Sequence, residues 1–148
     1  MTSLADRLVR YRKTLRVLFW VFAGALFVGT HWPALRIDVP MIRRPDLVVH
    51  FVIFAAWFGL FWLTAYVGEP LRLRSILLAV VVACVYAGVD EGLQAIPWVR
   101  RTCAWDDYAA NCVGVALGAF AALVATLVST TRAARATTSD RHPVPPSA

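Results

Sequence analysis

Residues 47–68 read LVVHFVIFAAWFGLFWLTAYVG, an uninterrupted stretch without Asp, Glu, Lys or Arg. A helix needs about 20 mostly apolar residues to cross the roughly 30 Å hydrocarbon core of a bilayer. This stretch therefore predicts a membrane-spanning helix. Three further apolar runs meet the same criterion, at about residues 17–32, 75–96 and 107–128. The sequence predicts an all-α integral membrane protein, a bundle of four transmembrane helices.

The composition agrees with this fold class. Of 148 residues, 59% are hydrophobic and only 16% are charged, against about 25% charged residues in a soluble domain. The net charge of +6 lies in short clusters between the apolar runs, so no basic stripe for nucleic acid is expected. We predict a membrane domain over residues 1–131 and a disordered tail over 132–148, rich in Thr, Ser and Pro.

The connections carry an uneven number of basic residues. The amino-terminal arm, the connection between the second and third spans, and the tail hold ten Arg or Lys, and the other connections hold five. By the positive-inside rule both termini are expected to be cytoplasmic, in the cell (inner) membrane. The arm at residues 1–16 has the spacing of an amphipathic helix lying on the inner leaflet. A cleavable signal peptide is the alternative, but the apolar run continues past Ala23-Gly24-Ala25, which favours an anchor.

Polar residues gather at the predicted outer ends of spans two, three and four. They are Asp46, His50, Asp90, Glu91, Gln94, Asp107 and Asn111, with Arg100 and Arg101 in the last outer connection. Three pairs, Asp46 with His50, Asp90 with Gln94 and Asp107 with Asn111, are spaced four residues apart, so each pair shares a helix face. In spans three and four that face continues as Ala or Gly at the same spacing, which favours close helix packing. These pairs are expected to face the bundle interior.

Carboxylates inside a span require compensation, because one at mid-bilayer costs roughly 2.5 to 3.5 kcal/mol. The candidate partners are Arg100 and Arg101, the arginines before span two, and His50. In one interpretation, Arg101 pairs with Glu91 or Asp107 and only locks the bundle. In the other, the groups form a polar site on the outer face, where Arg binds phosphate or carboxylate and the acids hold a cation or relay a proton. His31 and His142 are expected to be incidental.

Metal binding is a weaker hypothesis. His50 with Asp46, Glu91 and Asp107 offers one nitrogen and three carboxylates, a donor set suited to Mg, Mn or Zn. No strong metal motif such as HExxH is present. We therefore expect no cofactor and keep a divalent ion at His50, Glu91 and Asp107 as an alternative.

The polar motifs together resemble the VanZ-like family of small bacterial membrane proteins. The resemblance rests on Pro45-Asp46-x-x-x-His50-Phe51, Asp90-Glu91-x-x-Gln94, Arg101-Thr102 and Asp107-x-x-x-Asn111-x-x-Gly114-x-x-x-Gly118, over about residues 45–120. The family's namesake is associated with low-level resistance to the glycopeptide antibiotic teicoplanin, by an unknown mechanism. The resemblance implies a multi-pass cell-membrane protein with an outward polar site that engages cell-envelope precursors.

Three functional hypotheses follow. The first is a protein that binds a lipid-linked or glycopeptide-related ligand among the membrane lipids. The second is a membrane-embedded hydrolase or transferase acting on a lipid phosphate, with His50 as general base and a metal held by carboxylates. The third is a small transporter or scramblase, for which Gly114 and Gly118 would join two copies of the chain.

Overall fold

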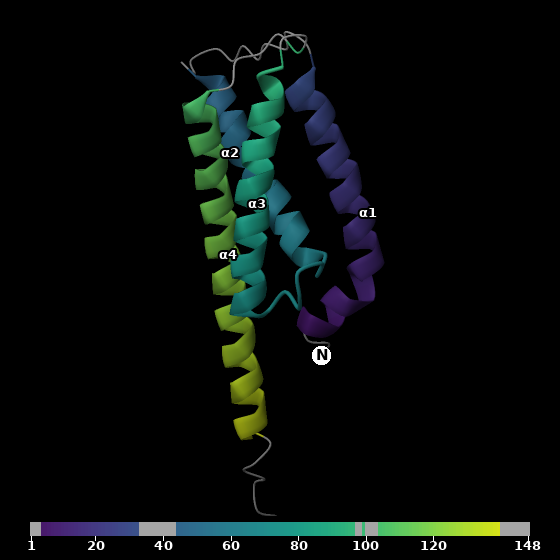
Figure 1. The fold of residues 1–148 in the computed structure, drawn as a ribbon. Helices are drawn as coiled ribbons and strands as arrows, with labels where there is room; N and C mark the ends of the chain where they lie inside the picture. Colours follow the sequence, from purple (N-terminus) through teal and green to yellow (C-terminus); the bar gives the residue numbers. More distant parts are fainter. Residues whose placement is uncertain (1–3, 33–43, 97–98, 100–103, 140–148) are drawn as a thin grey trace, which may run out of the picture.

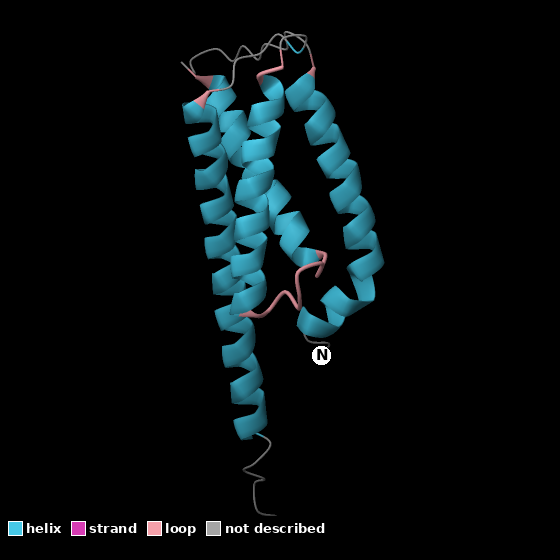
Figure 2. Ribbon diagram, viewed as in Figure 1, coloured by secondary structure: helices cyan, strands magenta, loops and turns pink. Residues whose placement is uncertain are grey.

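The computed structural model describes residues 4–32, 44–96, 99 and 104–139. This part of the chain forms the helices α1 (Leu4–His31), α2 (Pro45–Leu63), α3 (Leu73–Gln94) and α4 (Trp105–Ser139), and Figure 2 shows no strand in it. All four helices are long and apolar enough to cross a membrane. The fold is all-helical as predicted, and it supports a multi-pass membrane protein.

The helices alternate in direction. In Figure 1, α1 and α3 run one way along the bundle, and α2 and α4 run the other way. Helix α2 contacts each of the others, and its contact with α4 is the most extensive. We call the end where α1 and α3 finish and α2 and α4 begin the polar end. The start of α1 and the end of α4 lie toward the opposite end, and which side of a membrane each end faces stays a prediction.

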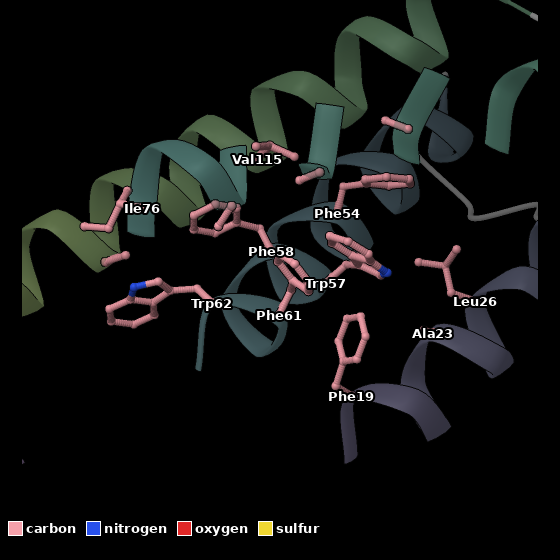
Figure 3. Packing of buried hydrophobic residues seen from close by; sticks show 14 residues of the cluster. Phe19, Ala23, Leu26, Phe54, Trp57, Phe58, Phe61, Trp62, Ile76 and Val115 are labelled. Carbon is pink, nitrogen blue, oxygen red and sulfur yellow. The ribbon is translucent and has the colours of Figure 1, made fainter. Parts of the chain in front are cut away.

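The core is built from large aromatic side chains on α2. Figure 3 shows them between α1 and the α3–α4 pair. The ring of Trp57 stacks on Tyr86 of α3, with centroids 4.7 Å apart, and Phe19 of α1 meets its edge at 5.3 Å. Aromatic rings bury large areas and add favourable ring contacts. Helix α2 is therefore the centre against which the other helices pack.

Small residues set the distance between helices. On α3, the seam of Ala79, Ala83 and Ala87 is completely buried, as the spacing predicts. On α4, Gly114 lies against the backbone of Phe51, and Gly118 lies against Phe58. The two glycines are therefore occupied by α2 of the same chain, because a backbone approach this close needs residues without a Cβ. That Gly114 and Gly118 join two copies of the chain stays a prediction, and within one chain they pack against α2.

The outward faces of the helices remain apolar. Val81, Val85 and Val89 on α3 and Phe120 on α4 are more than half exposed. A soluble monomer rarely exposes such continuous apolar surface. These faces have the composition expected of a surface covered by lipid.

Two predicted boundaries are wrong. The second span ends at Leu63 and not at residue 68, because Ala65 and Gly68 adopt positive φ angles of 58° and 122° and turn the chain. Helix α4 continues to Ser139, beyond the predicted end of the fourth span at residue 128, and disorder in the tail stays a prediction. Arg132-Ala133-Ala134-Arg135 is made of strong helix formers, which extend a helix without packing. Residues 140–148 lie outside the described part.

The predicted arm belongs to α1, which is one helix from Leu4. Two of its basic residues hold the α2–α3 connection. Arg12 pairs with Glu69 at 3.0 Å, and Arg16 donates a hydrogen bond of 3.2 Å to the carbonyl oxygen of Thr64. The arm therefore has contacts within the bundle, and its position on the inner leaflet stays a prediction.

Candidate functional site

The predicted polar residues meet at the polar end of the bundle. Helix α2 provides His50, α3 provides Asp90, Glu91 and Gln94, and α4 provides Asp107 and Asn111, all of them buried. Asp46, at the start of α2, is only partly buried. The predicted site residues Arg100 and Arg101 lie outside the described residues. The six buried side chains come from three helices because each helix has its polar residues at the same end.

His50 lies at the centre of this cluster. Its Nδ1 atom is 3.0 Å from Oδ1 of Asn111, and its Nε2 atom is 3.9 Å from Oδ2 of Asp107. His50 also interacts electrostatically with Asp90 and Glu91. Because an amide oxygen only accepts hydrogen bonds, Nδ1 of His50 is the donor to Asn111. This bond fixes the orientation of the imidazole ring, while the separation from Asp107 is too long for a hydrogen bond.

Asp90 is held by residues from α1 as well as α3. Thr30 donates a hydrogen bond of 3.0 Å to Oδ1, and Gln94 donates one of 3.2 Å to Oδ2. Nδ1 of His31 lies 3.8 Å from Oδ1. His31 therefore lies beside the cluster, while its Nδ1 atom is 2.9 Å from the carbonyl oxygen of Phe27 on its own helix, and its incidental role in function stays a prediction. Its position at the polar end, next to Thr30 at the close of an apolar run, is the signal that could have placed it in the cluster.

Only one of the two carboxylate oxygens of Glu91 has a hydrogen-bond partner in the described chain. Its Oε1 atom accepts a hydrogen bond of 3.3 Å from the backbone N–H of Ala104, just before α4. Its Oε2 atom is buried and has no hydrogen-bond partner among the described residues. Glu91 also experiences the negative charges of Asp107 and Asp90. The carboxylate is thus placed where a positive charge or a donor would be favourable.

At the polar end of the described bundle, Arg44 pairs with acids. Its guanidinium lies 2.9 Å from Asp46 and 2.8 Å from Asp106, and 3.7 Å from Asp107. The hydrogen bonds to Asp46 and Asp106 raise the pKa of Arg44 above its ordinary value. Both carboxylates also lie in the first turns of helices, where the helix dipole favours negative charge. Arg44 is exposed and joins the starts of α2 and α4. The sequence also offered it as a partner for Asp90 and Glu91 of α3, but its ion pairs are with acids of α2 and α4.

Unpartnered polar atoms distinguish this cluster from an ordinary ion-pair network. Oε2 of Glu91, Oδ1 of Asp107 and Nδ2 of Asn111 are buried without a hydrogen-bond partner in the described chain. Burying such a group unpaired costs about 1 to 3 kcal/mol, and more when the group is charged. Most buried polar groups in proteins have partners. With Nε2 of His31, four of the five such atoms in the described part of the chain belong to residues at the polar end.

The metal hypothesis finds no grouped donor set. Across residues 4–32, 44–96, 99 and 104–139, no three His, Cys, Asp or Glu side chains stand close enough together to hold a metal ion. His50 and Asp107 approach each other, but Glu91 does not complete a triad with them. A divalent ion at His50, Glu91 and Asp107 therefore stays a prediction.

Comparisons with protein families, curated proteins and solved structures find no match to this chain.

Proposed function

We propose that this chain is a VanZ-like protein of the cell membrane that binds the polar headgroup of a lipid-linked cell-envelope molecule at its polar end. The observation that carries the proposal is the set of buried, unpartnered polar atoms on Glu91, Asp107 and Asn111. A cluster that served only to lock helices together would be expected to pair all its atoms.

The position of the cluster favours a ligand that is itself held in the membrane. The helices present apolar faces to their surroundings, and the polar residues occupy the last turns of α3 and the first turns of α2 and α4. In a bilayer that depth corresponds to the headgroup region. The headgroup of a lipid reaches this depth without leaving the membrane.

The sequence adds two expectations, which are the side of the membrane that the polar end faces and the charge of the ligand. With both termini cytoplasmic, the polar end faces outward, where cell-wall precursors are used. Arg100 and Arg101 would supply cations for a phosphate or pyrophosphate group. The acids and the amide would take the hydroxyl or amine groups of an attached sugar.

A direct test uses the protein in phosphatidylcholine nanodiscs and a polyprenyl pyrophosphate-linked amino sugar as the probe. Wild type is expected to bind the probe saturably, and Asn111→Leu is expected to weaken binding at least about tenfold, since the variant removes an amide from the site. Thr126→Val is the matched control, because Thr126 is buried on α4 and its hydroxyl bonds only Ala122 of its own helix. Equal affinity in wild type and a correctly folded Asn111→Leu would refute the proposal.

If the proposal holds, a cell that contains this protein is expected to resist glycopeptide antibiotics. Expression in a susceptible bacterium is expected to raise the inhibitory concentration of teicoplanin, and His50→Ala at equal membrane abundance is expected to remove the increase. His50 is chosen because it contacts Asn111 and faces Asp107. Resistance that survives this substitution would separate any cellular role from the polar cluster.

A hydrolase or transferase is a second candidate, and one observation favours it. Asn111 fixes the His50 ring through Nδ1 and leaves Nε2 without a hydrogen bond, 3.9 Å from Asp107. An imidazole held in this way could accept a proton from water or a hydroxyl group. Release of inorganic phosphate from polyprenyl pyrophosphate, abolished by His50→Ala and weakened by Asn111→Ala, would support this candidate. Tight binding of the lipid without turnover would refute it.

A further inference from the structure

Two cysteines meet across the contact between α3 and α4, away from the polar cluster. Cys84 of α3 and Cys112 of α4 are both free thiols and partly buried. Their side chains interact through a hydrogen bond between the two thiol groups. The function proposed for the polar end uses neither of them. Two thiols in contact can form a bond with each other, which a single cysteine cannot do.

The packing on either side of the thiols explains why they meet. Helices α3 and α4 lie side by side and run in opposite directions (Figure 1). Nearer the polar end, the ring of Tyr108 on α4 lies 3.7 Å from the position that a Cβ on Gly88 of α3 would take. Each cysteine stands four residues, or one helical turn, farther from the polar end than this contact. The antiparallel pairing therefore places Cys84 opposite Cys112.

The thiols lie at the depth of the hydrocarbon core. Cys84 stands ten residues before the last residue of α3, and Cys112 stands seven residues after the first residue of α4. At about 1.5 Å per residue, they are about 10–15 Å from the polar end of the bundle. The residues that follow them, Val85 and Val113, are 62% and 58% exposed on the apolar outer surface. A reactant dissolved in the lipid can therefore approach the two partly buried thiols.

The contacts of Cys112 are those of a reactive thiol. Its sulfur interacts with the thiol of Cys84 and with the phenolic hydroxyl of Tyr108. Both groups can donate a hydrogen bond to this sulfur when it is ionised, and the thiolate is the form of cysteine that reacts. Across the described residues, no group of three His, Cys, Asp or Glu side chains could hold a metal ion. A disulfide needs only the two sulfurs.

We infer that Cys84 and Cys112 are a dithiol that a lipid-soluble quinone oxidises to a disulfide between α3 and α4. In this reaction two S–H bonds break and one S–S bond forms. The two protons and two electrons pass to the quinone, which becomes the hydroquinone. A quinone fits the location, because it dissolves in the bilayer and accepts two electrons together with two protons. The bond ties together the helices that carry Glu91 and Asp107, and the inference does not depend on the ligand of the polar end.

The experiment treats the reduced, full-length protein in phosphatidylcholine nanodiscs with a benzoquinone that carries a decyl chain and no ring hydrogen. Such a quinone has no free ring position to which a thiol can add. Free thiols are then counted by maleimide labelling in denaturant and mass spectrometry. The chain has three cysteines, and Cys103 lies outside the described residues, so Cys103→Ser is the reference protein. It is expected to lose both thiols together, to form one hydroquinone per chain, and to recover both thiols in dithiothreitol.

The variants are made in the same reference protein. Cys84→Ser is expected to keep the thiol of Cys112 free, because a disulfide needs a second sulfur. The matched control combines Cys84→Ser with Val85→Cys, which moves one thiol to the next position of α3 and about 100° around the helix. It is expected to keep both thiols. Tyr108→Phe removes the hydroxyl near Cys112 and is expected to slow the oxidation at least about threefold without changing its end point. Circular dichroism verifies that each variant folds.

Several results would overturn the inference. Two thiols that stay free in the quinone-treated reference protein refute it, as does a bond that joins two chains on a gel without reductant. Equal oxidation of the control with Val85→Cys would show that contact between the thiols is not required. A disulfide that forms only when Cys103 is present assigns the bond to another pair. Oxidation by hydrogen peroxide but not by the quinone refutes an oxidant from the lipid phase.

Discussion

Nδ1 of His50 on α2 lies 3.0 Å from Oδ1 of Asn111 on α4. The side chains are 5% and 0% exposed, and this hydrogen bond joins the two helices with the most extensive contact in the bundle. It also sets the direction of the imidazole ring. One interaction therefore links the packing of the bundle to the geometry of the polar cluster.

This hydrogen bond gives a first prediction, tested by a double-mutant cycle. His50→Phe and Asn111→Leu are each expected to destabilise the protein, because each leaves a buried partner unpaired. The loss of unfolding free energy in the double variant is expected to be smaller than the sum of the losses in the two single variants. The difference, which is the coupling energy, is expected to be about 1 kcal/mol, in the range measured between membrane helices.

Unfolding in mixed micelles, followed by circular dichroism, measures the three variants. Thr126→Val with His50→Phe is the control cycle, since the hydroxyl of Thr126 bonds its own helix. Its coupling is expected to be zero. A coupling of zero for His50 and Asn111 as well would show that their hydrogen bond does not contribute to stability.

A second prediction concerns the close approach of α2 and α4. Gly114→Ala would place a methyl group against the backbone carbonyl of Phe51, which cannot move without displacing the helix. The variant is expected to lose at least about 2 kcal/mol of unfolding free energy, as overpacking in a tight core does. Gly29→Ala is the control, because a Cβ there meets nothing within 4 Å.

The same variant tests where the glycine pair acts. If Gly114 packs within the chain, Gly114→Ala lowers the stability of the monomer, and the partly buried cysteines Cys84 and Cys112 react faster with thiol reagents. A variant that stays as stable as wild type but changes from dimer to monomer would instead place the glycines between two copies.

Much of the fold follows from the sequence, for identifiable physical reasons. The spans are long apolar runs, and four-residue spacing places Asp90 with Gln94 and Asp107 with Asn111 on buried faces. The contribution of α1 was not predicted. Thr30 and His31 follow an apolar run, and a polar residue at such a boundary is also normal at a membrane interface. Only the packing of α1 beside α3 brings Thr30 to Asp90.

The extent of α4 was missed for a different reason. The apolar run was the criterion for the end of the fourth span, but the Ala and Arg residues at 132–135 have a high intrinsic helix propensity that extends the helix. The role of Arg44 was also missed in part. The sequence shows that an arginine stands next to Asp46, but only the fold brings Asp106 to the same guanidinium.

A third prediction tests the link between α1 and the polar cluster. Thr30→Val removes the hydroxyl donor to Oδ1 of Asp90 and keeps the shape of the side chain. It is expected to cost about 1 kcal/mol of stability, because a buried carboxylate loses a donor. Amide hydrogen exchange at the end of α1 is expected to become faster than in wild type, while exchange in α2 stays unchanged. Thr130→Val is the control, since its hydroxyl bonds only Leu127 of its own helix.

The opposite outcome has a clear meaning. If α1 exchanges at the same rate in Thr30→Val and wild type, the aromatic contacts of Phe19 with Trp57 and Phe61 hold α1 in place without help from the cluster. Asp90 would then be satisfied by Gln94 alone.

A fourth prediction concerns the exposed ion pairs at the starts of α2 and α4. Arg44 holds Asp46 and Asp106 from a position where its own side chain is 51% exposed. Surface ion pairs contribute little to stability and are weakened by salt. The two carboxylates also keep the favourable helix dipole when the arginine is removed. Arg44→Gln is therefore expected to unfold slightly earlier than wild type at low ionic strength and at the same point at about 1 M salt, where the Debye length is about 3 Å.

Unfolding curves of Arg44→Gln at several salt concentrations measure this effect, with Arg12→Gln as the control for an exposed pair at the other end. A large loss of stability that persists at high salt would show that Arg44 holds the helix ends through geometry and not through screened charge. In that case the starts of α2 and α4 would depend on Arg44 for their mutual position, and His50 and Asn111 would lose their alignment in the same variant.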